Sequence, residues 1–284
     1  MNTPSTPPTT SGKSQTELIY ERQQRQIFRF KLGVRISWAV LITVLLFAFS
    51  GVSFNIFGLQ VRTIVLDFDF IRKWTPFIFG GLGLTILLSI LSTTLASVLA
   101  LLGALGRLSK FPPAYALASF YISLIRGTPL LLQIIFFFLA VAQMGIQLSG
   151  FWAGVIALGL NYGAYMTEIM RAGIQSVGIG QREAALAIGM NQTQIMHRIV
   201  LPQALRLVIP PIGNQFIAML KDTALVSVTG VVWELLWRAQ KVGKANFKTM
   251  EALLVAAVFY WIITIIFSVV QSRIEAYLAK GERT

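Results

Sequence analysis

The sequence lacks cysteine, has one histidine and is poor in charged residues. Without cysteine the chain forms neither disulfides nor thiolate metal sites, and His197 alone cannot build a histidine metal cluster. Charged residues make up 12% of the 284 residues and hydrophobic residues 55%, whereas soluble domains are about a quarter charged. Together with a mean hydropathy of +0.70, this composition predicts a multi-pass membrane protein.

Acidic residues are scarce, with 11 Asp and Glu against 24 Lys and Arg, a formal net charge of +13. The basic residues lie in tails and loops between apolar runs, so we interpret them as orientation signals and exclude nucleic acid as a partner. Fifteen of them lie in four segments: 1–36, 106–114, 171–206 and 272–284. Seven lie in the three segments that alternate with these: 58–75, 147–150 and 230–251. The richer set predicts that both termini and the loop within 171–206 are cytoplasmic.

Patterns that would make the chain an enzyme are missing as well. Ser11-Gly12-Lys13-Ser14 ends like a phosphate-binding loop, but the required upstream glycine is replaced by Pro7 and no strand is expected before it. No pair of residues is spaced for acid–base catalysis. We therefore predict a non-catalytic chain.

Apolar runs predict six membrane spans, near 37–57, 76–105, 130–146, 151–170, 205–229 and 251–271. The first run is alternatively a signal peptide, although the polar and basic region 1–36 is long for one and Ala48-Phe49-Ser50 is a weak cleavage site. The Pro-, Thr- and Ser-rich start of that region predicts disorder.

Prolines predict breaks in two of these runs. Gly127-Thr128-Pro129 indicates a short interfacial helix over 115–126 before the span 130–146, or alternatively one continuous kinked helix. Pro210-Pro211 predicts a break near the start of the fifth span. Gly159 and Gly163 are spaced for close helix packing, either within one bundle or between subunits.

A polar stretch over 180–202 separates two of the spans. Residues 181–188 favour a helix that Gly189 can end with a positive φ angle. Asn191 and Gln194 are spaced as an N-cap and its partner, and Pro202 should end the second helix. An ordinary amphipathic loop would show similar local signals.

Motif spacing nevertheless resembles a known family. Glu183, Ala184, Ala185, Gly189, Ile199, Leu201 and Pro202 stand as in the EAA loop of ATP-binding-cassette (ABC) importer permeases. Four further segments resemble the polar amino-acid branch of these permeases: 126–130, 201–204, 210–214 and 221–225. The resemblance covers residues 76–272.

The resemblance implies an all-α polytopic membrane protein with a five-helix type I permease core and one additional N-terminal transmembrane helix. The segments are then a cytoplasmic tail 1–36, the additional helix 37–57, an external insert 58–75, the core 76–272 with its cytoplasmic coupling loop 180–202, and a tail 273–284. The resemblance also implies that the chain lies in the inner membrane and that it has several partners. These are a dimer of ATP-binding subunits that bind ATP and Mg, a second permease, identical or paralogous, and an extracytoplasmic amino-acid-binding protein. No cofactor is expected in this chain.

Ionisable residues inside an apolar run suggest a transport path. Lys221 and Asp222 provide one charge of each sign for an amino acid, and Thr223, Asn214 and Glu168 are further candidates for this path. Alternatively, the charges form buried ion pairs that hold helices together. An ion-gradient-driven secondary transporter and a channel are the rival functions, although six spans without a repeat argue against the former.

Overall fold

A computed structural model describes residues 15–57 and 59–280, which form two compact units, Met1–Leu66 and Asp67–Thr284. The first unit contains one long helix, α1 (Gln15–Ala48), and an antiparallel hairpin of β1 (Ser53–Ile56) and β2 (Leu59–Arg62). Ser53 pairs with Arg62 at the open end of the hairpin. The predicted disorder at the start of the chain falls mostly on residues 1–14, outside the described part.

The structure corrects the bounds of the first predicted span. Helix α1 continues without a break from the basic region and ends at Ala48, so residues 49–57 are not helical. Its part Arg22–Ala48 is long and apolar enough to cross a membrane. Gly51, with a φ of +73°, leads into an extended segment instead. The hairpin also occupies part of the insert 58–75, which we predicted only as polar.

The second unit is a helical bundle. Its principal helices are α2 (Phe68–Phe79), α3 (Leu82–Leu108), α4 (Pro112–Arg126), α5 (Leu130–Ile135), α6 (Val141–Gln143), α7 (Gly150–Ser176), α8 (Ile179–Ala187), α9 (Gln192–Ile195), α10 (Leu201–Asp222), α11 (Leu235–Ala245) and α12 (Thr249–Lys280). Two π-helical segments, η1 (Phe136–Ala140) and η2 (Met196–Val200), and a 3₁₀ segment, η3 (Thr223–Thr229), connect some of them.

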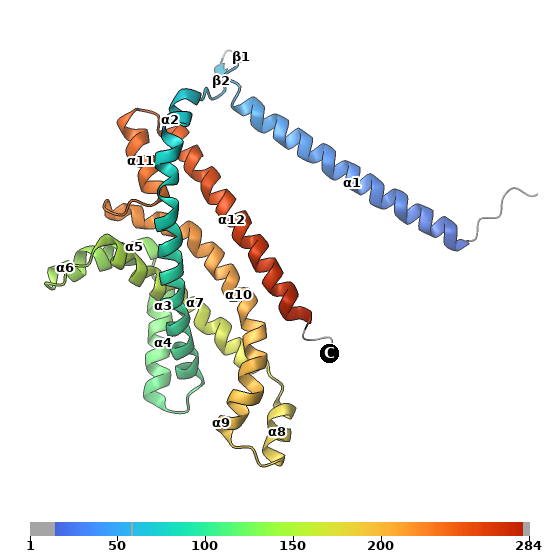
Figure 1. The fold of residues 1–284 in the computed structure, drawn as a ribbon, viewed down its shortest axis with the longest axis vertical. Helices are drawn as coiled ribbons and strands as arrows, with labels where there is room; N and C mark the ends of the chain where they lie inside the picture. Colours follow the sequence, from blue (N-terminus) through green and yellow to red (C-terminus); the bar gives the residue numbers. More distant parts are fainter. Residues whose placement is uncertain (1–14, 58, 281–284) are drawn as a thin grey trace, which may run out of the picture. The chain divides into compact units, whose positions relative to one another are not determined.

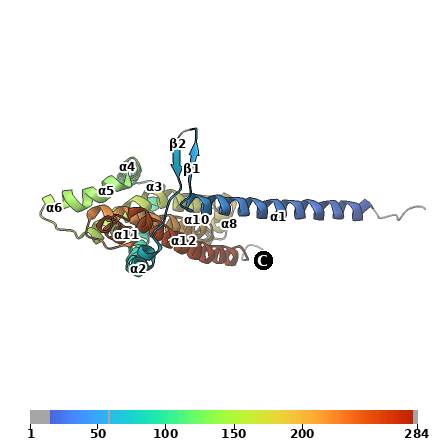
Figure 2. The same cartoon turned by 90° about the horizontal axis from the view of Figure 1, so that it is seen from above.

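These helices form layers around α3 and α7, which pack along each other (Figure 1). Figure 2 shows α4 and α5 on one side of the unit and α2 and α12 on the other. One core cluster lies between α3, α7 and α10, and a second lies between α2, α11 and α12. Helices α8 and α9 lie at the end of the unit opposite α2 and α11 (Figure 1).

The glycines of α7 serve packing inside the bundle. A Cβ atom at Gly159 would come within 2.5 Å of the side chain of Leu95, and one at Gly163 would come within 3.0 Å of the Cβ of Leu99. Both leucines belong to α3. The small residues therefore let α3 and α7 approach closely within one chain.

Among the described residues of this unit, Phe68–Leu108 and Thr249–Leu278 are apolar and long enough to cross a membrane, and α4 with α5–α6 qualifies as a bent pair. Helix α7 covers the span predicted at 151–170, and α10 covers the span predicted at 205–229 as far as Asp222, after which η3 follows; neither helix meets this test. Both carry polar residues, such as the buried Asn161 and Thr167 of α7. These side chains face the bundle interior, where they are hydrogen bonded.

Prolines act differently at the two predicted breaks. Helices α4 and α5 meet at 104° across residues 127–129, so the continuous kinked helix is wrong. Helix α4 lies alongside α3 as part of the bundle (Figure 1). In contrast, α10 passes through Pro210 and Pro211 without ending, so the break predicted there is wrong. Next to them, Gln271 of α12 donates to the carbonyl of Pro210 at 2.9 Å and tethers this part of α10 to α12.

Candidate functional site

The loop over 180–202 consists of one short helix and the beginning of a long one, joined by a tight glycine turn. Helix α8 ends at Ala187, and Gly189 has a φ of +83°. The N–H of Gly189 donates to the carbonyl of Leu186, and the N–H of Met190 donates to that of Ala185. These bonds satisfy carbonyls that the helix end would leave free. The predicted glycine termination is confirmed.

The second helix of the loop begins with the predicted capping pair. The side chain of Asn191 accepts from the backbone N–H of Gln194 at 2.9 Å, and the side chain of Gln194 accepts from the N–H of Asn191 at 2.9 Å. This reciprocal pair fixes the direction of the chain immediately after the glycine turn.

The predicted stop at Pro202 is wrong. Helix α9, η2 and α10 follow one another without a gap from Gln192 to Asp222. In η2 the N–H of Leu201 donates to the carbonyl of Met196, five residues earlier, so the helix widens by one residue. Pro202 then stands in the first turn of α10, where the missing N–H is tolerated.

The motif residues of this coupling loop divide into two groups. Ala185 is buried in a small core with Ile195 and Val200, which holds α8 against the second helix. Glu183 and Ala184 of α8 are exposed, as are Gly189 and Pro202, while Ile199 and Leu201 are half-buried. The loop thus presents part of its motif to a partner and uses the rest to hold its own shape.

Sequence reasoning missed three features of the loop. Ile188 is 79% exposed beside the glycine turn, an apolar side chain on a polar surface that the sequence alone signals weakly. Arg182 donates to the carbonyl of Ile174 at the end of α7, and Gln203 donates to Gln181 at 2.6 Å. The last two bonds tie α8 to α7 and α10, and nothing in their spacing indicates them.

A polar pocket of about 600 Å³ lies between the α4–α5 corner, α7 and α10. Its lining residues are Arg126, Gly127, Thr128, Pro129, Leu130, Asn161, Tyr162, Tyr165, Gln215 and Asp222. One cation and one anion thus face the same pocket from different helices. The carboxylate of Asp222 accepts a hydrogen bond from the hydroxyl of Tyr162 at 2.7 Å, and the guanidinium of Arg126 lies 4.9 Å from the ring centre of Tyr165.

Of the residues predicted for a transport path, the structure brings only Asp222 to this pocket. Lys221 and Asn214 are exposed and do not line it, and Thr223 is buried and donates to the carbonyl of Leu220. Glu168 instead forms ion pairs with Arg171 at 2.8 Å and, at 3.9 Å, with Arg107 of α3. The positively charged residue that lines this pocket together with Asp222 is Arg126, not Lys221.

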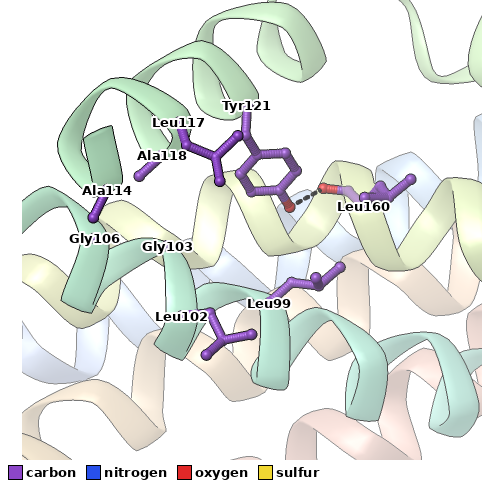
Figure 3. A pocket seen from close by; sticks show the side chains of 9 residues that line it. All are labelled: Leu99, Leu102, Gly103, Gly106, Ala114, Leu117, Ala118, Tyr121 and Leu160. Carbon is purple, nitrogen blue, oxygen red and sulfur yellow. Dashed lines mark hydrogen bonds between the residues drawn. The ribbon is translucent and has the colours of Figure 1, made fainter.

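A second pocket, of about 280 Å³, lies between α3 and α4 (Figure 3). Its lining includes Leu99, Leu102 and Leu117 and the backbone of Gly103 and Gly106. The hydroxyl of Tyr121 points into it, but donates to the carbonyl of Leu160 at 2.7 Å. This pocket therefore offers apolar surface and no free charged group, which suits hydrocarbon and not a zwitterion.

Comparison with protein families gives one match over most of the bundle. Residues 93–280 match the family described as binding-protein-dependent transport system inner membrane component. The first unit, with α1 and its hairpin, lies outside the matched residues.

Individual relatives agree with this match. The L-cystine transport system permease protein TcyB of Bacillus subtilis (strain 168) is 43% identical over 74% of this chain and 91% of its own length. The arginine transport system permease protein ArtQ of the same organism is 35% identical over 76% of this chain and 99% of its own length. A solved structure described as an amino acid ABC transporter with histidines has a TM-score of 0.71 at 38% identity, covering 75% of this chain and 100% of that one.

Proposed function

Because this chain belongs to the family of binding-protein-dependent transport system inner membrane components, we propose that it is the permease subunit through which an ABC importer moves polar amino acids. The chain is a multi-pass inner-membrane protein of this family and is itself non-catalytic. The family implies an ATPase, a substrate-binding protein and a second permease. Similarity to permeases named for cystine and arginine supports amino acids as the cargo class.

The observation that carries the cargo proposal is that Arg126 and Asp222, one cation and one anion, line the same polar pocket. An amino acid has a carboxylate that a guanidinium binds through two parallel bonds and an ammonium that a carboxylate accepts from. Tyr162 already donates to Asp222, so it orients the carboxylate toward the pocket. We place the amino acid between these two charges, with Asn161 and Gln215 as further polar contacts.

The coupling loop is proposed to receive the motion of the ATPase. Glu183, Ala184, Ile188 and Gly189 form its exposed surface, and this surface would enter a groove of an ATP-binding subunit that holds ATP and Mg. A dimer of that subunit, a second permease, identical or paralogous, and an extracytoplasmic amino-acid-binding protein complete the proposed assembly. Mass measurement of the solubilised complex should find two permease chains with two ATPase chains.

The proposed orientation places the coupling loop in the cytoplasm. The α3–α4 connection and α8–α9 lie at one end of the bundle, and α2 and α11 lie at the other (Figure 1). Counted along the sequence with both tails, the alternating set that includes 106–114 and 171–206 holds 15 Lys and Arg against 7 in the other set, which favours the cytoplasmic side for the coupling loop. We propose from the basic residues of the segments 1–36 and 272–284 that both termini are cytoplasmic as well. Protease access to a reporter at residue 20 tests this, because only an external N-terminus would be cleaved from outside.

Transport measurements separate this function from an ion-gradient-driven transporter or a channel. The complex, purified from its native membrane, is reconstituted in vesicles, and uptake of labelled arginine, glutamine and cystine is followed. We expect uptake of at least one of them to require ATP and to persist when ion gradients are dissipated. Uptake that continues without ATP but stops without a gradient would overturn the proposal.

A further inference from the structure

The corner between α4 and α5 leaves a backbone carbonyl without its helical donor. Pro129 has no N–H, so the carbonyl of Ile125, four residues earlier, cannot receive the bond it would have in a continuous helix. Nε2 of Gln133 donates to this carbonyl at 2.8 Å. The same Nε2 lies 3.1 Å from the carbonyl oxygen of Thr128 and 2.8 Å from Oγ1 of Thr128. The two hydrogens of the Gln133 amide therefore serve three acceptors.

The other end of this side chain reaches a different helix. Oε1 of Gln133 accepts from Nδ2 of Asn161 in α7 at 3.2 Å. Gln133 is 6% exposed and does not line the pocket, so its amide has no easy alternative partner in water. Breaking this bond therefore leaves buried polar groups unpaired, which disfavours the present arrangement of the corner.

The corner and Asn161 line the same polar pocket from different helices. Residues 126–130 line it from the corner and Asn161 lines it from α7, whereas Gln133 does not line it. Among the described side chains, a ring contact also joins these walls, since the guanidinium of Arg126 lies over Tyr165. The position of Arg126 relative to α7 thus depends on a residue that the cargo does not touch.

We propose that Gln133 is a positioning residue: it holds the 126–130 corner against Asn161 and thereby sets the affinity of the polar pocket for a zwitterionic amino acid. This role rests on the proposed function, because it takes the pocket as the place where the amino acid binds. Gln133 acts through Arg126, which it places, and through Asn161, which it orients. Gln133 thus affects the affinity for the cargo without contacting it.

Equilibrium binding to the purified permease–ATPase complex, without the binding protein, tests this role. The probes are labelled arginine, glutamine and cystine. Gln133→Leu removes every amide bond at similar volume, and we expect the Kd of the bound amino acid to rise about tenfold, a loss typical of a buried hydrogen bond. The mass of the assembled complex should not change. The matched control is Gln143→Leu, an exposed glutamine at the end of α6, which should leave the Kd unaltered.

A purely structural role predicts a different pattern. In that case Gln133→Leu would lower the yield or the Tm of the complex while the Kd of the assembled fraction stayed at the wild-type value. Comparison with Asn161→Leu and the double variant sharpens the test, because residues that act through one bond give non-additive losses. We expect the double variant to bind no more weakly than Asn161→Leu alone. Additive losses would contradict the proposal.

A milder substitution keeps the test decisive if Gln133→Leu does not assemble. Gln133→Met has a similar length without the amide, and a wild-type Kd for the assembled Met variant would overturn the positioning role. Arg126→Gln and Asp222→Asn separate this failure from failure of the pocket itself. If they weaken binding and the Gln133 variants do not, only the positioning role is wrong. If none of the three probes binds to the wild type, the pocket and the role of Gln133 are both wrong.

Discussion

In the coupling loop, the bonds that shape the turn join near neighbours, such as Asn191 with Gln194 and Met190 with Ala185. In the polar pocket, the decisive contacts join residues far apart in the chain, such as Tyr162 and Asp222, which are 60 positions apart. The loop presents its motif outward, whereas the pocket directs its charges inward. We therefore expect substitutions in the loop to change energy coupling and those in the pocket to change affinity, each without the other effect.

Gly189→Val should have the largest effect, because it strains the turn on which the whole loop surface depends. The φ of +83° is unfavourable for a β-branched residue and costs about 1–3 kcal/mol locally. Uptake should be abolished, while the protein remains in the membrane and the Kd of the amino acid stays unchanged. The experiment compares vesicle uptake with equilibrium binding.

Gly180→Val is the matched control for this variant. Gly180 lies in α8 and, like Gly189, has open space around it, but its φ is not positive. We expect the Gly180→Val variant to take up the amino acid at the wild-type rate. Normal uptake by Gly189→Val, or equal loss in both variants, would contradict the assignment of the turn.

Asp222→Asn should have the next largest effect, and it should appear in affinity. The amide keeps the volume of the side chain and still accepts from Tyr162, but it removes the negative charge offered to an ammonium group. Charge-assisted hydrogen bonds contribute about 1.5–3 kcal/mol, so the Kd should rise at least about tenfold. ATP hydrolysis by the assembled complex in the absence of cargo should not change.

Lys221→Gln is the control on the adjacent residue, since Lys221 is exposed and outside the pocket. Its Kd should match the wild type. If Lys221→Gln raised the Kd and Asp222→Asn did not, Lys221 and not Asp222 would be the charged residue that binds the amino acid.

Ile188→Ser should have a smaller effect on coupling. Ile188 is 79% exposed in the isolated chain, and burying such a side chain in a groove contributes about 1.5–3 kcal/mol. The variant should bind the ATPase at least about tenfold more weakly, so uptake should recover when ATPase is supplied in excess. Ile146→Ser, an exposed isoleucine before α7, serves as the control. Failure of excess ATPase to restore uptake would show that Ile188 does not contribute to docking.

The difference between the two regions also explains how much the sequence could predict. The glycine turn and the capping pair follow from the conformational preferences of Gly189 and Asn191, which neighbouring residues suffice to set. The break at Pro129 was predictable for the same reason. Pro202 was misjudged because the π-helical turn before it reroutes the backbone bonds, and no simple residue preference indicates such a turn.

The pocket was only partly predictable because its members come from three separate parts of the chain. Asp222 was identified as a charge within an apolar run, a local signal. Lys221 gave the same signal although it faces out of the pocket, and which side a residue faces depends on packing. Arg126 ends the helix predicted over 115–126, as it ends α4, but its place in one pocket with Asp222 requires the 104° corner. Gln133 gives no signal at all until that corner is known.

The smallest effect is expected outside both regions, at Asp67. Its carboxylate accepts from the N–H of Phe70 at 2.9 Å and pairs with Lys248 at 3.2 Å, which joins the start of α2 to the residue preceding α12. The bond from Phe70 and, next to it, Lys248 lower the pKa of Asp67 below its ordinary 3.8. Because the folded pKa is lowered, the stabilisation is fully present above the ordinary value and is lost as the pH falls through the lowered one. Asp67→Asn should therefore lower the Tm slightly at neutral pH, since the ion pair is exposed, and the difference from wild type should vanish in acid. Asp69→Asn removes the same charge two residues later and serves as the control. A difference that grows as the pH falls would show that the ionised carboxylate is not what stabilises this junction.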